Sequence, residues 1–293
     1  MIFQGELYSM KKLLSLITLI AVISCQETNY NIDDFPSEIV FDPTAACISA
    51  KISNSNPKGN NDVLVWAEEF DNPTLCQDNW VFETVPPENG GWFNGEQQYY
   101  TDRSSNASIL NGVLRITAKK EVFKGKNFTS TRITTQDLFE FKYGKVQVRA
   151  KIPQAQGTWP AIWMLGANID SAGWPFCGEI DIMEHGDLQP GLVSSAVHRD
   201  GPNGSPIYNR GEILLQNVSS QFHIYEVEWK ADSIVFSVDG LAYHNFKTNT
   251  EMPFNQDFFI ILNVAVGGSF VGNVIDPNFT SASMEIDYVR VYQ

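Results

Sequence analysis

The chain has 293 residues and a formal net charge of -14 at pH 7, with 12% aromatic and 18% charged residues. This composition excludes a disordered or coiled-coil protein, and the length suits one large all-β domain. The negative charge disfavours a nucleic-acid partner, because phosphate binding needs clusters of Lys and Arg that the sequence does not show. A neutral substrate fits this charge better than a polyanionic one.

The N-terminus has the pattern of an export signal. Two lysines follow Met10, a better start than the first methionine, and precede the apolar run 13–24, which is too short to span a membrane. The run ends in Val-Ile-Ser before Cys25, which resembles the lipobox of bacterial lipoproteins, where the signal is cleaved before a cysteine that is then lipidated. The alternative is an ordinary cleaved signal with an incidental cysteine. We assign residues 1–25 to this signal and expect a lipoprotein of the bacterial cell envelope, or a secreted protein.

A polar segment separates the signal from the expected domain. Residues 26–61 are rich in Asn, Asp, Ser and Pro without sustained periodicity, which is typical of a tether, so we place the folded domain at 62–293. Cys47 and Cys76 are a possible disulfide pair that sequence does not establish. Cys177 is interpreted as a small buried residue. The Cys and His spacings do not suggest a zinc site.

From Val63 onward, short apolar or alternating runs are separated by turn signals such as Asn-Gly, Asp-Gly and Gly-Gly, and no long stretch has helical periodicity. Many short strands at this spacing indicate a β-sandwich of antiparallel sheets. The predicted strands are 110–118, 144–151, 179–184, 193–198, 222–229, 234–238, 258–266 and 284–292.

The segment GEIDIMEHGD holds three carboxylates, Glu179, Asp181 and Glu184, among apolar residues that favour a strand. Side chains on a strand alternate between faces, so Glu179 and Asp181 point the same way. Strict alternation would turn Glu184 away. We therefore predict a β-bulge at Ile182 or Met183, because one extra residue returns Glu184 to the acidic face.

Two neighbouring carboxyl groups are the apparatus of a retaining glycosidase, in which one is the nucleophile and the other the general acid/base. A third carboxylate between them raises at least one pKa, because like charges this close do not all stay ionised. The alternative reading is a solvated polar face of a half-exposed strand, since such alternation is common.

Tryptophans provide a second signal, because a sugar ring binds flat aromatic side chains with polar groups beside them. Four of them lie in Gly-rich or Pro-containing segments, where exposed rims form, and the other three are expected in the core. The rim candidates are Trp92, Trp159, Trp163 and, as the weakest sugar contact, Trp174; the core candidates are Trp66, Trp80 and Trp229.

Eight motifs extend over residues 63–293 in a fixed order. They are WAEEFD (66–71), NGEQQYYT (94–101), TRITT (131–135), GTWPAIWMLG (157–166), GWPFCGEIDIMEH (173–185), FHIYEVEW (222–229), LNVAVGG (262–268) and DYVRVY (287–292). Together they closely resemble glycoside hydrolase family 16, in particular its bacterial endo-β-1,3-glucanases, the laminarinases. The resemblance implies a concanavalin A-like β-jelly roll of two curved antiparallel sheets, with glucan lying along the concave face.

The resemblance also implies roles for the acids. The first glutamate of the family's motif, here Glu179, is the nucleophile, the last, here Glu184, is the acid/base, and Asp181 tunes their protonation. The extra residue before Glu184 marks the bulged branch, which includes laminarinases, agarases and carrageenases and disfavours a lichenase-type enzyme. His198 matches a histidine that hydrogen-bonds the acidic cluster.

Other implied positions concern substrate and metal. Substrate-binding residues on this basis are Trp92, Asn94, Glu96, Arg132, Trp159, Trp163 and His198. The chain departs from the usual pattern at Gly95, where many laminarinases have a second Asn. The family implies no cofactor for catalysis, but many members hold a structural calcium, here expected at Asp287 with backbone oxygens near Glu69 and Gly112.

The sequence thus predicts an exported, retaining endo-glycosidase that hydrolyses internal β-1,3 bonds of laminarin-type glucans. We expect a monomer that binds β-glucan and meets a membrane only through its lipid anchor. The alternatives are another family 16 activity, namely a mixed-linkage glucanase, an agarase or a carrageenase, and a non-catalytic glucan-binding protein on the same fold.

Overall fold

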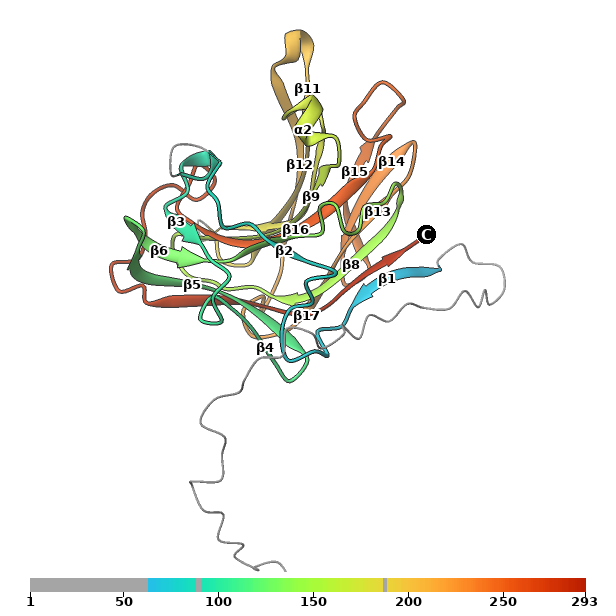
Figure 1. The fold of residues 1–293 in the computed structure, drawn as a ribbon. Helices are drawn as coiled ribbons and strands as arrows, with labels where there is room; N and C mark the ends of the chain where they lie inside the picture. Colours follow the sequence, from blue (N-terminus) through green and yellow to red (C-terminus); the bar gives the residue numbers. More distant parts are fainter. Residues whose placement is uncertain (1–62, 88–90, 187–188) are drawn as a thin grey trace, which may run out of the picture. The chain divides into compact units, whose positions relative to one another are not determined.

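Two sheets pack face to face in the computed structural model (Figure 1), which describes residues 63–87, 91–186 and 189–293. In these residues ten strands form one sheet and seven form the other, and only β3 and β6 pair in parallel. Helical structure in the described ranges is limited to single turns: η2 (Phe93–Gly95), α2 (Ile169–Ala172) and η3 (Pro202–Gly204). The predicted all-β sandwich is confirmed, whereas Cys25, Cys47 and the tether lie outside the described residues.

The ten-stranded sheet forms the outer layer of the bend that Figure 1 shows. Its order is β15 (Leu241–Lys247), β14 (Ser233–Val238), β13 (His223–Trp229), β8 (Gly144–Lys151), β17 (Ser281–Tyr292), β5 (Val113–Phe123), β6 (Lys126–Ser130) and β3 (Gln98–Tyr100), with β1 (Leu64–Glu68) on β17 and β4 (Ala107–Leu110) on β5.

The seven-stranded sheet lies on the inner side of the bend (Figure 1). Its order is β12 (Pro206–Leu214), β11 (Leu192–Asp200), β10 (Glu179–His185), β9 (Thr158–Gly166), β16 (Phe258–Val266), β7 (Arg132–Thr134) and β2 (Val81–Phe82).

Alternating side chains fill the space between the sheets. Val146 and Val148 of β8 and Val227 of β13 are buried in the main core, while their neighbours along each strand are not. Central strand β16 is buried on both faces, as its unbroken apolar run requires: Ile260 faces the main core and Ile261 a second cluster on the open side. The core between the sheets therefore packs against one face of the seven-stranded sheet and leaves its other face open.

The tryptophans expected in the core are there. Trp80 and Trp229 are each 1% exposed, and the half-buried Trp66 stacks on Phe139 with ring centroids 4.9 Å apart. Cys177 is a fully buried free thiol, as expected. Cys76 is disulfide-bonded, and its pairing with Cys47 stays a prediction.

At the free edge of the seven-stranded sheet, β12 rests on β15 of the other sheet. The His244 ring contacts Ser195 Oγ through Nδ1 at 2.8 Å and Asn209 Oδ1 through Nε2 at 2.7 Å, and burial lowers its pKa. A side chain at Gly211 would begin 2.3 Å from Cβ of His244. The two strands therefore lie as close as a glycine allows.

The predicted bulge in β10 is confirmed by the pairing on both sides of the strand. Against β9, Asp181 is opposite Trp163 and Met183 is opposite Ile162, so two steps on β10 match one step on β9. The same extra residue is present against β11. Ile182 and Met183 both enter the core, and Glu184 returns to the face of Glu179 and Asp181.

The predicted strands are all found, with ends that differ by a few residues. Strands that the sequence did not predict are short, or polar, or carry a proline. β1, β2, β3, β6 and β7 have two to five residues each, β12 and β15 are mostly exposed, and β9 contains Pro160. In the described part of the chain, no helix is long and apolar enough to cross a membrane.

The bulge makes Met183 a test of the support beneath the acids, since its side chain is fully buried. We expect Met183→Ala to lower the free energy of unfolding by about 2–5 kcal/mol, because it leaves a cavity. Met183→Leu conserves volume and should cost less than about 1.5 kcal/mol. Urea unfolding of both variants measures this difference, and equal stabilities would contradict the packing described.

Candidate active site

The register of the seven-stranded sheet lines up three rows of side chains on its open face, because directly opposed residues of paired strands share a face. Each row crosses β10 at one of the three acids. From β12 to β9 the rows read Tyr208, His198, Glu179, Leu165; then Arg210, Ala196, Asp181, Trp163; then Glu212, Ser194, Glu184, Ala161. The predicted acid cluster is thus a real constellation in the fold.

Each outer glutamate accepts a hydrogen bond from an indole. Trp174 donates from Nε1 to Glu179 Oε2 at 2.8 Å, and Trp159 donates from Nε1 to Glu184 Oε1 at 3.0 Å. Trp159 belongs to β9, whereas Trp174 lies in the loop before β10 and is 47% exposed. Both indoles favour the ionised carboxylate that they contact.

Asp181 and His198 lie between the two glutamates. Nε2 of His198 is 3.2 Å from Asp181 Oδ2 and 4.0 Å from Glu179 Oε1. The Asp181 side chain is 4% exposed, and Asp181 hydrogen-bonds Glu179. A hydrogen bond between two carboxyl groups requires a proton on one of them. The cluster therefore holds at least one proton. His198 lies beside the cluster as predicted, but Asp181 Oδ2 has no hydrogen-bond partner among the described residues, so the predicted hydrogen bond from His198 stays a prediction.

Burial and mutual repulsion raise the pKa of all three acids. Burial is the main cause in each case, and the charge of a neighbouring acid adds to it. The pKa of Glu184 rises to about 7 and that of Glu179 to about 8, while the pKa of Asp181 rises well above its ordinary value. Perturbed acids of this kind suit general acid chemistry near neutral pH.

Beyond β9, a chain of hydrogen bonds connects predicted binding residues. Trp163 Nε1 donates to Asn263 Oδ1 at 2.8 Å, and Asn263 Nδ2 donates to Tyr100 OH at 3.1 Å. Tyr100 OH in turn donates to Glu96 Oε2 at 3.0 Å, and burial raises the pKa of Glu96. Asn263 and Tyr100 were not predicted as site residues, although each lies in a motif that carried the resemblance, 262–268 and 94–101.

Arg132 joins the same region. Its Cζ lies 4.8 Å from the ring centroid of Trp163 and 5.3 Å from that of Trp92, and its Nε donates to Glu83. Trp92 is only 5% exposed and packs edge-on against Tyr100, so the expectation that it forms an exposed rim is wrong. Its burial depends on residues distant in the sequence, which no local pattern reveals.

Asn94 occupies the next loop. Its φ is +62°, and its carbonyl oxygen accepts from Ser269 N at 2.9 Å. This contact holds the 93–95 turn against the loop that follows β16, where Gly268 packs on Trp159. The structure thus brings Asn94, Glu96, Arg132, Trp159 and Trp163 to one side of the acids. Their contacts with sugar stay predictions.

On the other side of the acids, the structure shows groups that the sequence reading missed. Tyr208 is 69% exposed, and its ring centroid is 5.6 Å from that of His198. Arg210 lies on the same strand, β12, and contacts Phe270. Strand β12 is mostly exposed and has no regular apolar pattern in its sequence. Only its register against β11 identifies these side chains as neighbours of the acids.

The residues proposed for calcium meet where β17 changes partners. Ile286 pairs with Leu114 of β5 and Val289 pairs with Glu68 of β1, so Asp287 comes close to Gly112 and Glu69. Arg149 Nη1 donates to Asp287 Oδ2 at 2.6 Å, and Arg290 contacts both carboxylate oxygens of Glu69. The Asp287 carboxylate that the expected site would use is thus paired with Arg149, and calcium binding stays a prediction.

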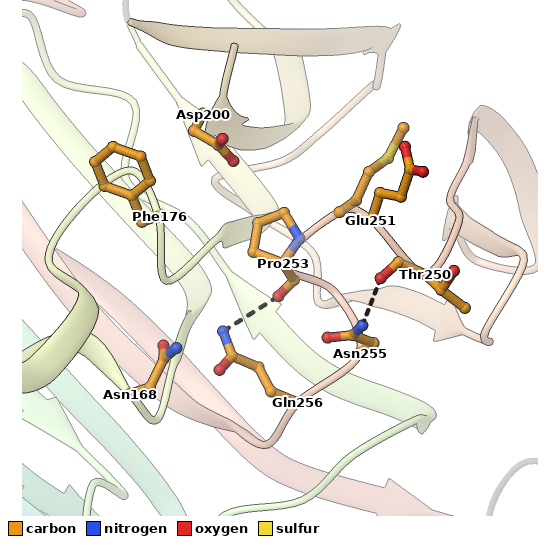
Figure 2. A pocket seen from close by; sticks show the side chains of 9 residues that line it. Asn168, Phe176, Asp200, Thr250, Glu251, Pro253, Asn255 and Gln256 are labelled. Atoms are coloured by element: carbon orange, nitrogen blue, oxygen red, sulfur yellow. Dashed lines mark hydrogen bonds between the residues drawn. The ribbon is translucent and has the colours of Figure 1, made fainter. Parts of the chain in front are cut away.

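A pocket of about 250 Å³ lies beside Phe176, in the loop that precedes β10 (Figure 2). Asn168 and Phe176 line one side of it and the turn 250–256 the other. Gln256 Nε2 donates to the carbonyl oxygens of Cys177 at 2.7 Å and Pro253 at 3.2 Å. The pocket is separate from the acid rows, and its Gln256 fixes the chain just before Glu179.

Two packed sheets with three closely spaced acids on the open face are the arrangement expected of a glycoside hydrolase. The family described as "Glycosyl hydrolases family 16" matches residues 94–290, and the chain belongs to this family. A β-glucanase from Rhodothermus marinus is 38% identical over 256 residues, which is 82% of this chain and 88% of that protein. These findings also confirm the family assigned from the sequence motifs.

Solved structures agree with this assignment and with the jelly roll. The laminarinase catalytic domain from Thermotoga maritima is 40% identical, with a TM-score of 0.72 over 80% of this chain and 99% of that chain. LamA from Zobellia galactanivorans, solved in complex with laminaritriose and laminaritetraose, is 38% identical, with a TM-score of 0.74 over 78% and 98%.

The raised pKa values make stability depend on pH. Between about pH 4.5 and pH 7 the folded chain keeps a proton on Glu184 that the unfolded chain has lost, so the free energy of unfolding falls as pH rises through this range. Glu184→Gln has no proton to lose at this position, so its free energy of unfolding lacks this contribution to the fall with pH. We expect the variant to gain about 1–3 kcal/mol relative to the wild type between pH 4.5 and pH 8, measured by urea unfolding.

Glu228→Gln is the matched control, because Glu228 lies on β13 of the other sheet with a side chain 43% exposed. Its stability should follow the wild-type pH curve. If the curves of Glu184→Gln and Glu228→Gln run parallel, the carboxyl of Glu184 is not destabilised by its surroundings.

Proposed function

We propose that the protein is a retaining endo-β-1,3-glucanase that cleaves internal bonds of laminarin-type glucans. The observation that carries this proposal is the bulge in β10, which returns Glu184 to the face of Glu179. Two neighbouring carboxyl groups on one face, one to attack as the carboxylate and one with a raised pKa to donate a proton, are what a double-displacement mechanism needs.

Glu184 protonates the glycosidic oxygen while Glu179 attacks the anomeric carbon. The bond to the leaving sugar breaks and a covalent glycosyl-enzyme forms. Glu184, now ionised, then takes a proton from the water that hydrolyses this intermediate. The pKa of about 7 lets Glu184 serve both as acid and as base near neutral pH.

The proposal requires Asp181 to hold the shared proton, because a charged Asp181 raises the pKa of Glu179. Of the two hydrogen-bonded acids, Asp181 has a side chain 4% exposed and Glu179 one 19% exposed. The more deeply buried carboxyl is less stable as an anion, so the shared proton resides on Asp181. Glu179 carries the charge, which the indole N–H of Trp174 stabilises.

The choice of a β-1,3-glucan rests on similarity and on the surroundings of the acids. The relatives include a laminarinase and a protein solved with laminari-oligosaccharides. On one side, Trp163 offers an aromatic face beside the polar groups of Asn263 and Glu96, which suits an apolar sugar face with a rim of hydroxyls. A pure glucan binder would not need the acid pair.

The proposal also includes export and a lipid anchor on Cys25, which rest on the N-terminal signal pattern alone. Cys25→Ser should release the protein from the membrane fraction into the soluble fraction without changing its specific activity. Fractionation of cells that express both forms tests this, and equal membrane association would contradict the anchor.

Replacing either glutamate should abolish hydrolysis. We expect Glu179→Gln and Glu184→Gln to lose at least about 100-fold in kcat/KM on laminarin, because each amide lacks the proton-transfer or nucleophilic function of the acid. Reducing-sugar release measures this loss. Glu228→Gln serves as the control, and unchanged circular dichroism shows that the variants fold. Near-normal turnover in either active-site variant would refute the mechanism.

The substrate is tested by comparing laminarin, lichenan, agarose and carrageenan side by side. We expect laminarin to give the fastest release of reducing sugar, with internal cleavage seen as oligosaccharides of mixed length. Preference for lichenan would instead indicate a mixed-linkage glucanase, and preference for agarose or carrageenan a galactan hydrolase. Inactivity on all four, with binding retained, would favour the glucan-binding alternative.

A further inference from the structure

Three side chains from separate segments stack beside Glu184. The rings of Trp159 and Phe270 lie nearly parallel, with centroids 5.0 Å apart and 17° between their planes. The guanidinium carbon of Arg210 lies 4.8 Å from the centroid of the same Phe270 ring. Strand β9, the loop after β16 and the edge strand β12 thus meet in one contact, the Trp159–Phe270–Arg210 stack.

One end of this stack touches the catalytic acid directly, since Trp159 Nε1 donates to Glu184 Oε1. The other end is the positively charged guanidinium of Arg210, which lies on the same open face of the sheet as the acids. Arg210 is opposite Ala196, which is opposite Asp181, so Arg210 lies on the open face two strands from β10. Its guanidinium lowers the pKa of Glu184.

Arg210 has a partner that limits its effect. Nη2 of Arg210 is 3.1 Å from Oε1 of Glu212, which follows it on the same face of β12. The Glu212 side chain is 48% exposed and that of Arg210 is 35% exposed. An exposed ion pair of this kind is weak, so Glu212 cancels only part of the electrostatic effect of Arg210 on Glu184.

The charged and titratable groups near Glu184 come from four strands, β10, β11, β12 and β15. Glu179 and Asp181 of β10 and the phenol of Tyr243 on β15 are acids, and His198 of β11 is positive when protonated. His198 lies within 4.0 Å of Glu179. Arg210 stacks on Phe270, Phe270 stacks on Trp159, and Trp159 donates to Glu184. These contacts place the permanent positive charge of Arg210 toward the Glu184 end of the cluster.

This placement matters because charge moves during the first chemical step. Glu179 begins as a carboxylate and becomes a neutral ester when it bonds the anomeric carbon. Glu184 begins protonated and becomes a carboxylate when its proton passes to the leaving oxygen. One negative charge has therefore moved along β10 from the Glu179 end to the Glu184 end.

We propose that Arg210, held by Phe270, is a positioning residue that stabilises the negative charge on Glu184 after proton transfer, and that Glu212 attenuates it. This rests on the proposed function, in which Glu184 is the acid/base. The guanidinium makes no contact with substrate in this role and acts through the field it places at Glu184. The stack keeps that field fixed, so no reorganisation is needed when the charge arrives.

The test is the pH dependence of kcat/KM on laminarin for four proteins: wild type, Arg210→Gln, Arg210→Lys and Glu212→Gln. Loss of the arginine raises the pKa of Glu184, so Arg210→Gln should move the alkaline limb up by about half a pH unit and lower kcat about three- to tenfold. Glu212→Gln frees the arginine and should move the limb down. Arg210→Lys keeps the charge and should leave the limb near its wild-type position.

These opposite shifts separate an electrostatic role from a structural one. A loss of activity that is equal at every pH in Arg210→Gln and is not restored by lysine would overturn the proposal, as would an unmoved limb in both Arg210→Gln and Glu212→Gln. Melting temperatures within a few degrees of wild type show that the variants fold. Turnover by Glu184→Gln would instead refute the proposed function itself.

Discussion

Crowding of three carboxyl groups on one face of the buried strand β10 is the constraint on which the site depends. In water their repulsion would be small, but near the core it raises each pKa and forces the cluster to hold a proton. The bulge of β10 creates this crowding, because without it Glu184 would enter the core and one of the two buried neighbours would face solvent. The bulge thus produces both the repulsion between the acids and the raised pKa values that the proposed acid catalysis uses.

The two ends of the site are built differently. Toward β16 and β7 a half-buried Trp163 is hydrogen-bonded to buried side chains, in a series from Asn263 through Tyr100 to Glu96. Toward β12 they are exposed, and Tyr208 and Arg210 reach solvent. A rigid end suits sugars that must be held in register for attack, and an open end suits a leaving chain of any length.

Sequence reasoning succeeded where the cause is local. The faces of Glu179 and Asp181 follow from strand periodicity, and the bulge follows from requiring Glu184 to join them. It failed where the cause is distant. Trp92 is buried by Tyr100 and an arginine forty residues away in the chain, and β12 has no apolar pattern to identify it. Strand β9 was missed because it contains Pro160, which the pairing tolerates since β10 bonds β9 only from Ala161 onward.

Gly211 shows how much of the open end depends on a missing side chain. The edge strand β12 carries Tyr208 and Arg210. It packs closely on β15 because Gly211 has no side chain, and His244 occupies the space that a Cβ atom at this position would need. Any larger residue would push the edge strand outward and carry the arginine away from the acid. A substitution of Gly211 would therefore disturb the site indirectly, although Gly211 lies outside the acid cluster and touches no reacting atom.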